Sequence, residues 1–267
     1  MIRNWSAGLI CLSIAAGASA QSIGPDSYGY VLTKTHNAAA FQTIVGAPGV
    51  NALTTPAMSH DDEAFTVPVP FTFSAYGANY HEVSICTNGF LLLGPNQATD
   101  FTNLSLESAM AAASPNMRTN TLLTPYWDDL FFFASPNTGA LLTLTRTSNG
   151  HQQFVVQWDQ VGYFNGTTAQ TATFQAILQD DGTIYYVYND VNGPDGQSNG
   201  GSSTIGIRDA NGDTNGRVLQ FFFGTGGAGP LVNGDLITIA VPEPTSLALA
   251  GLGLGGLAVR MRRKKTA

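Results

Sequence analysis

The chain has 267 residues, of which 43% are hydrophobic and 11% are charged, so it can form a globular core and is not a disordered acidic chain. Its formal charge of −7 is unevenly distributed: residues 21–241 hold 5 Lys/Arg against 17 Asp/Glu, a net −12, and the other basic residues lie near the two ends. An acidic body repels phosphate backbones, which excludes a nucleic acid partner.

The first 20 residues have the order of a secretory signal peptide. Arg3 precedes an apolar stretch, and the small residues Ala18 and Ala20 form a cleavage site before Gln21. The sequence therefore predicts export and processing by signal peptidase. Cleavage leaves Cys86 as the only cysteine, which excludes an intramolecular disulfide and favours a buried apolar role for its thiol.

Residues 21–240 carry the pattern of short strands joined by tight turns. In FTVPVPFTF, residues 65–73, aromatic and aliphatic residues alternate with Thr and Pro, which predicts an edge strand because proline cannot donate to a ladder. In FVVQWDQV, Phe154, Val156 and Trp158 share one face. Asp181-Gly182 predicts a hairpin turn, and residues 203–223 predict a second hairpin with a longer loop.

The fold class expected from these strands is all-β, a single sandwich-like domain of about ten to twelve short strands. One segment, residues 103–116, predicts a short covering helix that is capped by Ser105 and stopped by Pro115.

A calcium-loop pattern occurs in DANGDTNG, where Asp209, Asn211 and Asp213 occupy positions 1, 3 and 5. Thr214 stands where the pattern needs glycine, and Gln220 supplies no carboxylate at position 12. The favoured interpretation is an Asp/Asn/Gly-rich hairpin loop, with structural Ca²⁺ as the alternative. No other cofactor is expected.

PYWDDL holds the strongest candidate for buried polar chemistry. Asp128 and Asp129 are adjacent and face opposite sides of a strand, so they cannot act together on one sugar. We expect Trp127 in the core and one aspartate bonded to loop amides. The alternative is a carbohydrate-active enzyme that uses Asp128 or Asp129 with Asp159. A third acidic segment, SHDDEAF at residues 59–65, predicts a solvated loop whose side chains diverge.

The C-terminal segment, residues 241–267, has three parts in a fixed order. Pro242, Glu243 and Pro244 precede 15 uncharged residues, 245–259, which span about 22 Å as a helix. This is short for the roughly 30 Å hydrocarbon core of a membrane, although flanking side chains can extend to its surface. A basic stop-transfer cluster follows, made of Arg260, Arg262, Arg263, Lys264 and Lys265, and it orients the body outside the cell.

Five segments of the body, taken in order, resemble a nidogen-like (NIDO) domain over residues 65–223. They include the turn with Asn88, Gly89 and Phe90, and the proline–aromatic segment with Trp127 and Asp129. The resemblance implies a β-rich extracellular module associated with adhesion to matrix. It does not imply an enzyme. No cysteine-rich modules follow, so the matrix partner of the animal proteins is not carried over.

The tail resembles the PEP-CTERM sorting signal of Gram-negative bacteria over residues 241–265. That resemblance implies recognition of Pro242-Glu243-Pro244 by an exosortase, transient anchoring in the inner membrane, and release or attachment at the cell surface, often in a polysaccharide-rich biofilm matrix. The leading hypothesis is a non-enzymatic, surface-sorted protein that contributes to matrix adhesion or binds an extracellular polysaccharide or other polymer. A carbohydrate-active enzyme and a Ca²⁺-dependent structural module are the alternatives.

Overall fold

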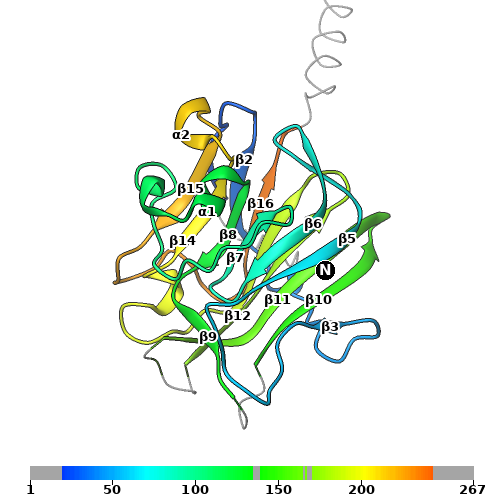
Figure 1. The fold of residues 1–267 in the computed structure, drawn as a ribbon, viewed down its shortest axis with the longest axis vertical. Helices are drawn as coiled ribbons and strands as arrows, with labels where there is room; N and C mark the ends of the chain where they lie inside the picture. Colours follow the sequence, from blue (N-terminus) through cyan, green and yellow to red (C-terminus); the bar gives the residue numbers. More distant parts are fainter. Residues whose placement is uncertain (1–19, 135–138, 165, 167–169, 243–267) are drawn as a thin grey trace, which may run out of the picture.

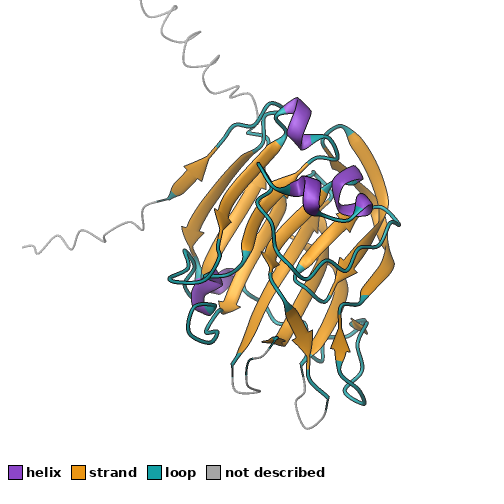
Figure 2. Ribbon diagram, turned by 60° about the vertical axis from the view of Figure 1, so that its left-hand side comes forward, coloured by secondary structure: helices purple, strands orange, loops and turns teal. Residues whose placement is uncertain are grey.

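Two antiparallel β-sheets pack face to face in the computed structural model, which describes residues 20–134, 139–164, 166 and 170–242 (Figures 1 and 2). The expected all-β sandwich is therefore confirmed. The described residues form sixteen strands. This number exceeds the expected ten to twelve because four of them, β1, β3, β4 and β9, have only two or three residues.

The parts of the chain outside the described residues include Ala18 of the signal peptide, Glu243 and Pro244 of the sorting motif, the proposed transmembrane segment 245–259 and the basic cluster. Within the described ranges, no helix has the length and apolar character needed to cross a membrane.

The larger sheet has ten strands in the order β1-β2-β16-β13-β12-β11-β10-β3, with β9 paired to β11 and β4 paired to β9. The last strand of the chain, β16, is internal, because it pairs with β13 on one side and with β2 on the other. The strands are β1 (Gln21–Ile23), β2 (Val31–His36), β3 (Asn51–Ala52), β4 (His60–Asp61), β9 (Leu130–Phe132), β10 (Ala140–Ser148), β11 (His151–Tyr163), β12 (Thr171–Gln179), β13 (Ile184–Asp190) and β16 (Asp235–Ala240).

The smaller sheet has six strands in the order β15-β14-β8-β7-β6-β5. The Pro-rich strand β5 lies at its edge, as expected, and its ladder with β6 is irregular between Pro68 and Phe73. The strands are β5 (Ala64–Ala75), β6 (Ala78–Cys86), β7 (Phe90–Leu93), β8 (Leu122–Trp127), β14 (Thr204–Arg208) and β15 (Val218–Phe223).

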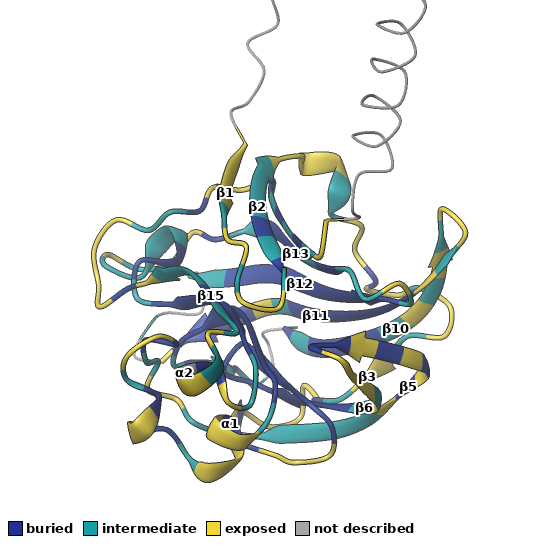
Figure 3. Cartoon of the chain, turned by 90° about the horizontal axis from the view of Figure 1, so that it is seen from above, coloured by how far each residue is buried: buried dark blue, intermediate teal, exposed yellow. Residues whose placement is uncertain are grey.

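The main core lies between the sheets, and alternate residues of the long strands contribute to it. Figure 3 shows that the buried residues gather along these strands. Phe154, Val156 and Trp158 of β11 all belong to this core, as their spacing predicts. The Trp158 ring stacks on Phe174 of β12 with 4.9 Å between ring centroids. Cys86 is fully buried, and burial raises the pKa of its thiol well above the ordinary value, which confirms its apolar role.

A second apolar cluster covers the outer face of the smaller sheet. The prediction of one helix over residues 103–116 is wrong in this region. Ser105 accepts hydrogen bonds from the backbone amides of one turn only. A 3₁₀ turn, η2 (Met110–Ala112), follows this turn. The helix α1 (Pro115–Thr119) then begins at Pro115, where the expected helix was to end. Proline suits the first helical turn because its missing N–H has no partner there. Leu106, Met110 and Met117 are buried against the sheet, and this packing overrides the helix propensity of the alanines.

The loops of residues 37–50, with the 3₁₀ turn η1 (Ala38–Ala40), cover part of the outer face of the larger sheet. Ile44 is buried there, and its amide donates to the side chain of Gln157 on β11 at 3.0 Å.

Both expected hairpins form. Gly182 has a φ of +85°, and it turns the chain between β12 and β13. The longer loop between β14 and β15 folds into a helical turn, α2 (Gly212–Asn215), and a further 3₁₀ turn, η3 (Ser198–Gly200), precedes β14.

Candidate functional site

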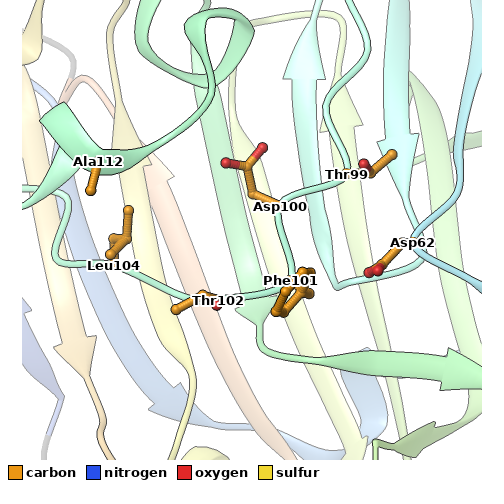
Figure 4. A pocket seen from close by; sticks show the side chains of 7 residues that line it. All are labelled: Asp62, Thr99, Asp100, Phe101, Thr102, Leu104 and Ala112. Carbon is orange, nitrogen blue, oxygen red and sulfur yellow. The ribbon is translucent and has the colours of Figure 1, made fainter.

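An open groove lies outside the smaller sheet, along the segment that follows β7. One hollow of about 440 Å³ is lined by Asp62, Thr99, Asp100, Phe101, Thr102, Leu104 and Ala112 (Figure 4). A second hollow of about 140 Å³ is lined by Asp61, Asp62, Phe101, Asp129 and Phe164. Because Asp62 and Phe101 line both hollows, we treat them as one site and name it the acidic groove.

Three carboxylates converge in this groove. One ligand oxygen each of Asp61, Asp62 and Asp129 lies within 4.8 Å of the other two. Asp61 ends β4, which pairs with β9, and Asp129 lies in the turn just before β9. Asp62 has a φ of +49°, a left-handed conformation that interrupts the alternation of an extended strand. Asp61 and Asp62 are exposed, as expected for a solvated acidic segment, but the expectation that their side chains diverge is wrong.

His60 departs from the expectation of a solvated loop. It is buried, and its Nδ1 lies 2.8 Å from Glu63 Oε2. Its Nε2 accepts the amide of Thr55 at 2.9 Å, so we assign the ring proton to Nδ1. His60 thus holds the loop in place and is not among the three converging ligands.

Asn88 connects the loops that carry the three carboxylates. Its side chain is fully buried, and its Nδ2 donates to Asp62 Oδ1 at 2.7 Å. Its Oδ1 accepts the amide of Leu130 at 3.0 Å, and its carbonyl accepts the amide of Asp128 at 3.2 Å. One buried amide therefore orients Asp62 and the turn that carries Asp129 at the same time.

The other residues of the sequence motif support Asn88. Gly89 has a φ of +76°, and a Cβ atom there would lie 2.1 Å from the carbonyl oxygen of Tyr126. Phe90 packs edge-on against Trp127 with 5.7 Å between ring centroids, and Trp127 Nε1 donates to the carbonyl of Asp100 at 2.8 Å. The structure brings Asn88, Gly89, Phe90, Trp127 and Asp129 together beneath one wall of the groove.

The electrostatics of the groove follow from this crowding. Burial, and then the charges of Asp62, Asp61 and Asp128, raise the pKa of Asp129 from 3.8 to about 6. Burial and the charge of Asp62 also raise the pKa of Asp61. A carboxyl group with such a pKa can exchange a proton near neutrality, and three carboxylates at this spacing could share a divalent cation.

Asp128 and Asp159 lie apart from this cluster. Asp128 is buried, accepts the amide of Asp129 at 2.9 Å and accepts a hydrogen bond from the hydroxyl of Ser202. This is the arrangement expected for an aspartate bonded to a loop amide beside a buried Trp127. Asp159 accepts a bond from Gln157 Nε2 at 2.8 Å on the outer face of the larger sheet. Asp129 is therefore grouped with Asp61 and Asp62, and the pairing with Asp159 that the enzyme alternative requires is not formed.

The calcium-loop pattern takes the form of an internally bonded turn. Asp209 accepts the amide of Ala210 at 2.8 Å and the side chain of Asn215 at 3.1 Å, and it forms an ion pair with Arg217 at 3.2 Å. Asn211 directly precedes α2, and the side chain of Asp213 lies outside the described residues. The oxygens of Asp209 are thus already bonded to protein donors.

The residues of the processing sites lie at the edges of the described chain. Ala20 and Pro242 are both exposed, and Pro242 follows β16 after a single residue, Val241.

The two-layer sandwich, with its groove among loops, defines a β-rich module. The family model described as NIDO related matches residues 29–221, and the chain belongs to this family. The model of the PEP-CTERM protein-sorting motif matches residues 240–264. Both expected resemblances are therefore confirmed, and the motif indicates an exported surface or extracellular protein of a Gram-negative bacterium that is processed by an exosortase. No curated protein and no solved structure matches the chain.

The sequence did not indicate that four residues belong to one site: Asp61, Asp62, Phe101 and Phe164. Asp61 and Asp62 were visible as an acidic run, but only the positive φ of Asp62 makes them converge. Phe101 and Phe164 lie in segments without strand periodicity, and their only signal was an aromatic residue in a polar loop.

Proposed function

We propose that the body is a non-enzymatic adhesive module that binds an extracellular polymer, such as a matrix polysaccharide, in the acidic groove. The observation that carries this proposal is the placing of two exposed aromatic rings beside the carboxylates. Phe101 is 49% exposed and Phe164 is 43% exposed, and both line the hollow that contains Asp61, Asp62 and Asp129. Exposed aromatic rings next to convergent polar groups are typical of a recognition surface.

The chemistry of the groove suits a hydroxylated chain. Carboxylate oxygens accept hydrogen bonds from hydroxyl groups, and the faces of Phe101 and Phe164 can cover the C–H faces of sugar rings. Phe164 is held by Phe131, with 6.2 Å between ring centroids, so one aromatic side of the groove is ordered. An open groove also admits a segment from within a long polymer, which an enclosed pocket would not.

Affinity electrophoresis with defined polysaccharides, including cellulose derivatives, dextran and chitosan, tests this proposal. Phe101→Ala and Phe164→Ala should each weaken retardation by the polymer that binds the native protein. Phe223→Ala is the matched control, because Phe223 is 37% exposed on β15 and lines neither hollow of the groove. Equal retardation of all four proteins would exclude the groove as the binding site.

The sorting part of the proposal concerns the tail. Residues 245–259 anchor the chain in the inner membrane for a time, and an exosortase cuts at Pro242-Glu243-Pro244 and leaves the body at the cell surface or in the matrix. The matching sorting motif over residues 240–264 supports this order of events. Intact-mass measurement of the protein from the cell envelope and the medium tests it. A mass that retains residues 245–267 would contradict the cleavage.

A second candidate function is hydrolysis of a glycosidic bond, and one observation favours it. The pKa of Asp129 is raised to about 6, as in a general acid, and two further carboxylates lie beside it. Release of reducing ends from the bound polysaccharide would support this function. Asp129→Asn should abolish the release, while binding persists. Binding without release favours the adhesive module.

A further inference from the structure

A second pocket lies on the outer face of the larger sheet, and it shares no residue with the acidic groove. Its volume is about 240 Å³, and its walls include Gln42, Arg146, Gln153, Gln179 and Tyr185 above an aliphatic floor that contains Ile177. Drug-sized pockets are commonly about 300–1,000 Å³, so this one suits a single ring-sized unit. We name it the Arg146 pocket.

Within the described part of the chain Arg146 forms no ion pair with an acidic residue, in contrast to Lys34 and Arg217. Lys34 pairs with Asp235 at 2.9 Å, and Arg217 pairs with Asp209 at 3.2 Å. Among the described residues, no carboxylate forms an ion pair with Arg146, although the body carries 17 acidic residues. Arg146 is also half-buried, and its burial lowers the pKa of its guanidinium. A partly desolvated charge without a counterion gains more from an anion than a fully hydrated one does.

The guanidinium is held in a fixed orientation by two side-chain amides. Its Nε donates to Gln153 Oε1 at 3.0 Å, and one terminal nitrogen donates to Gln42 Oε1 at 3.2 Å. A guanidinium has five N–H groups, so three of them have no acceptor within the described part of the chain. These N–H groups are available to a planar anion.

The amides themselves form a built and buried row. Gln153 and Gln179 are direct cross-strand partners on β11 and β12, and each is only 7% exposed. Gln153 Nε2 donates to Gln179 Oε1 at 2.9 Å, and Gln179 Nε2 donates to Asp181 at 2.9 Å. This chain of bonds fixes which atoms of the amides face Arg146. It also places the negative charge of Asp181 two residues beyond Gln179 of the pocket wall.

The charges around the pocket discriminate between anions. One guanidinium can balance one negative charge, and the neighbouring Asp181 opposes a second one within the pocket. A carboxylate carries one charge and is planar, so it can accept two parallel bonds from the guanidinium. A phosphate monoester carries nearly two charges near neutrality.

We infer that the Arg146 pocket binds the carboxylate of an acidic sugar, such as a uronate unit of an anionic polysaccharide. The carboxylate pairs with Arg146, the ring hydroxyls bond to the amides at the pocket wall, and the sugar ring lies against Tyr185 and the aliphatic floor. This site is independent of the acidic groove, so the inference does not rest on the function proposed for that groove.

Isothermal titration of the full chain in mild detergent with an oligogalacturonate tests the inference. Arg146→Gln should lower the association constant at least tenfold, because it removes a charge-assisted pair. Arg146→Lys keeps the charge but loses the planar fork, and it should bind with intermediate affinity. Arg118→Gln is the matched control, because it removes one charge from an exposed residue of α1 and should change the constant less than twofold.

Three further probes identify the chemistry that is bound. Free galacturonate should compete with the oligomer but bind more weakly, and neutral maltohexaose should not compete. Dextran sulfate should bind no more tightly than the oligogalacturonate. Equal binding of the neutral and acidic oligomers, tighter binding of the sulfated polymer, equal losses in Arg146→Gln and Arg118→Gln, or no binding at all would overturn the inference. Thermal unfolding of each variant shows whether a loss of binding is a loss of fold.

Discussion

The carboxyl group of Asp129 is expected to make the stability of the body depend on pH, and Asp129→Asn should remove that dependence. The substitution is nearly isosteric, and the Asp129 side chain accepts no hydrogen bond from the described residues, whereas its backbone amide and carbonyl keep their partners in Asp128 and Phe164. It therefore removes the negative charge and little else.

The sign follows from the direction of the pKa shift. The folded protein binds the proton of Asp129 more tightly than the unfolded chain does, because the pKa rises from 3.8 to about 6 on folding. The associated stabilisation is fully present below about pH 4 and is lost as the pH rises through 6. Two pKa units correspond to about 3 kcal/mol, and screening at this half-exposed side chain reduces the expected effect to about 1 kcal/mol.

Urea unfolding at pH 4, 5, 6 and 7 measures this effect. The free energy of unfolding of Asp129→Asn, relative to the native protein, should rise by about 1 kcal/mol across this range. Asp195→Asn is the matched control, because it removes the same charge from an exposed aspartate in the loop before β14 that lines neither hollow of the groove. Parallel curves for the native protein and Asp129→Asn would show that the crowded carboxylates do not act as described.

Three other changes have definite expected outcomes. Gly89→Ala should destabilise the protein by more than about 2 kcal/mol in urea, because it combines a positive φ with a Cβ atom 2.1 Å from the Tyr126 carbonyl oxygen; a loss below 0.5 kcal/mol would contradict that geometry. The thiol of Cys86 should react with Ellman's reagent only on unfolding, and rapid reaction of the native protein would contradict its burial. Millimolar Ca²⁺ should raise the thermal midpoint at pH 7 if Asp61 and Asp62 share a cation with the third carboxylate, and Asp62→Asn should remove the increase; an equal shift in both proteins would place the calcium elsewhere.

Local patterns predicted the parts of the fold that depend on neighbouring residues. The alternation in residues 65–73 and its prolines gave the edge strand β5, and Asp181-Gly182 gave the hairpin between β12 and β13. The predicted motif residues Asn88 and Trp127 both support the walls of the groove: Asn88 accepts the amide of Leu130, and Trp127 donates to the carbonyl of Asp100 in the segment after β7.

The rest depends on contacts between distant segments. The acidic groove needs the left-handed turn at Asp62, which the amide of Asn88 stabilises from 26 residues away. The alanines of residues 109–113 favour a helix locally, but the burial of Met110 and Met117 against the sheet decides their conformation. Arg146 looked like any exposed strand residue, and only its bonds to Gln42 and Gln153 show that it is built into a pocket.

The position of β16 has a mechanical consequence for a protein that is held at a surface by its C-terminal end. Any tension applied through Pro242 enters the body along β16, which is bonded to β13 on one side and to β2 on the other. Ladder hydrogen bonds run perpendicular to the strand, so a pull along its axis shears both ladders at once instead of opening them one bond at a time. An edge strand in the same place would be held by one ladder only. In the adhesive function proposed above, the internal strand would let the body bear a load between a tethered C-terminal end and a bound polymer.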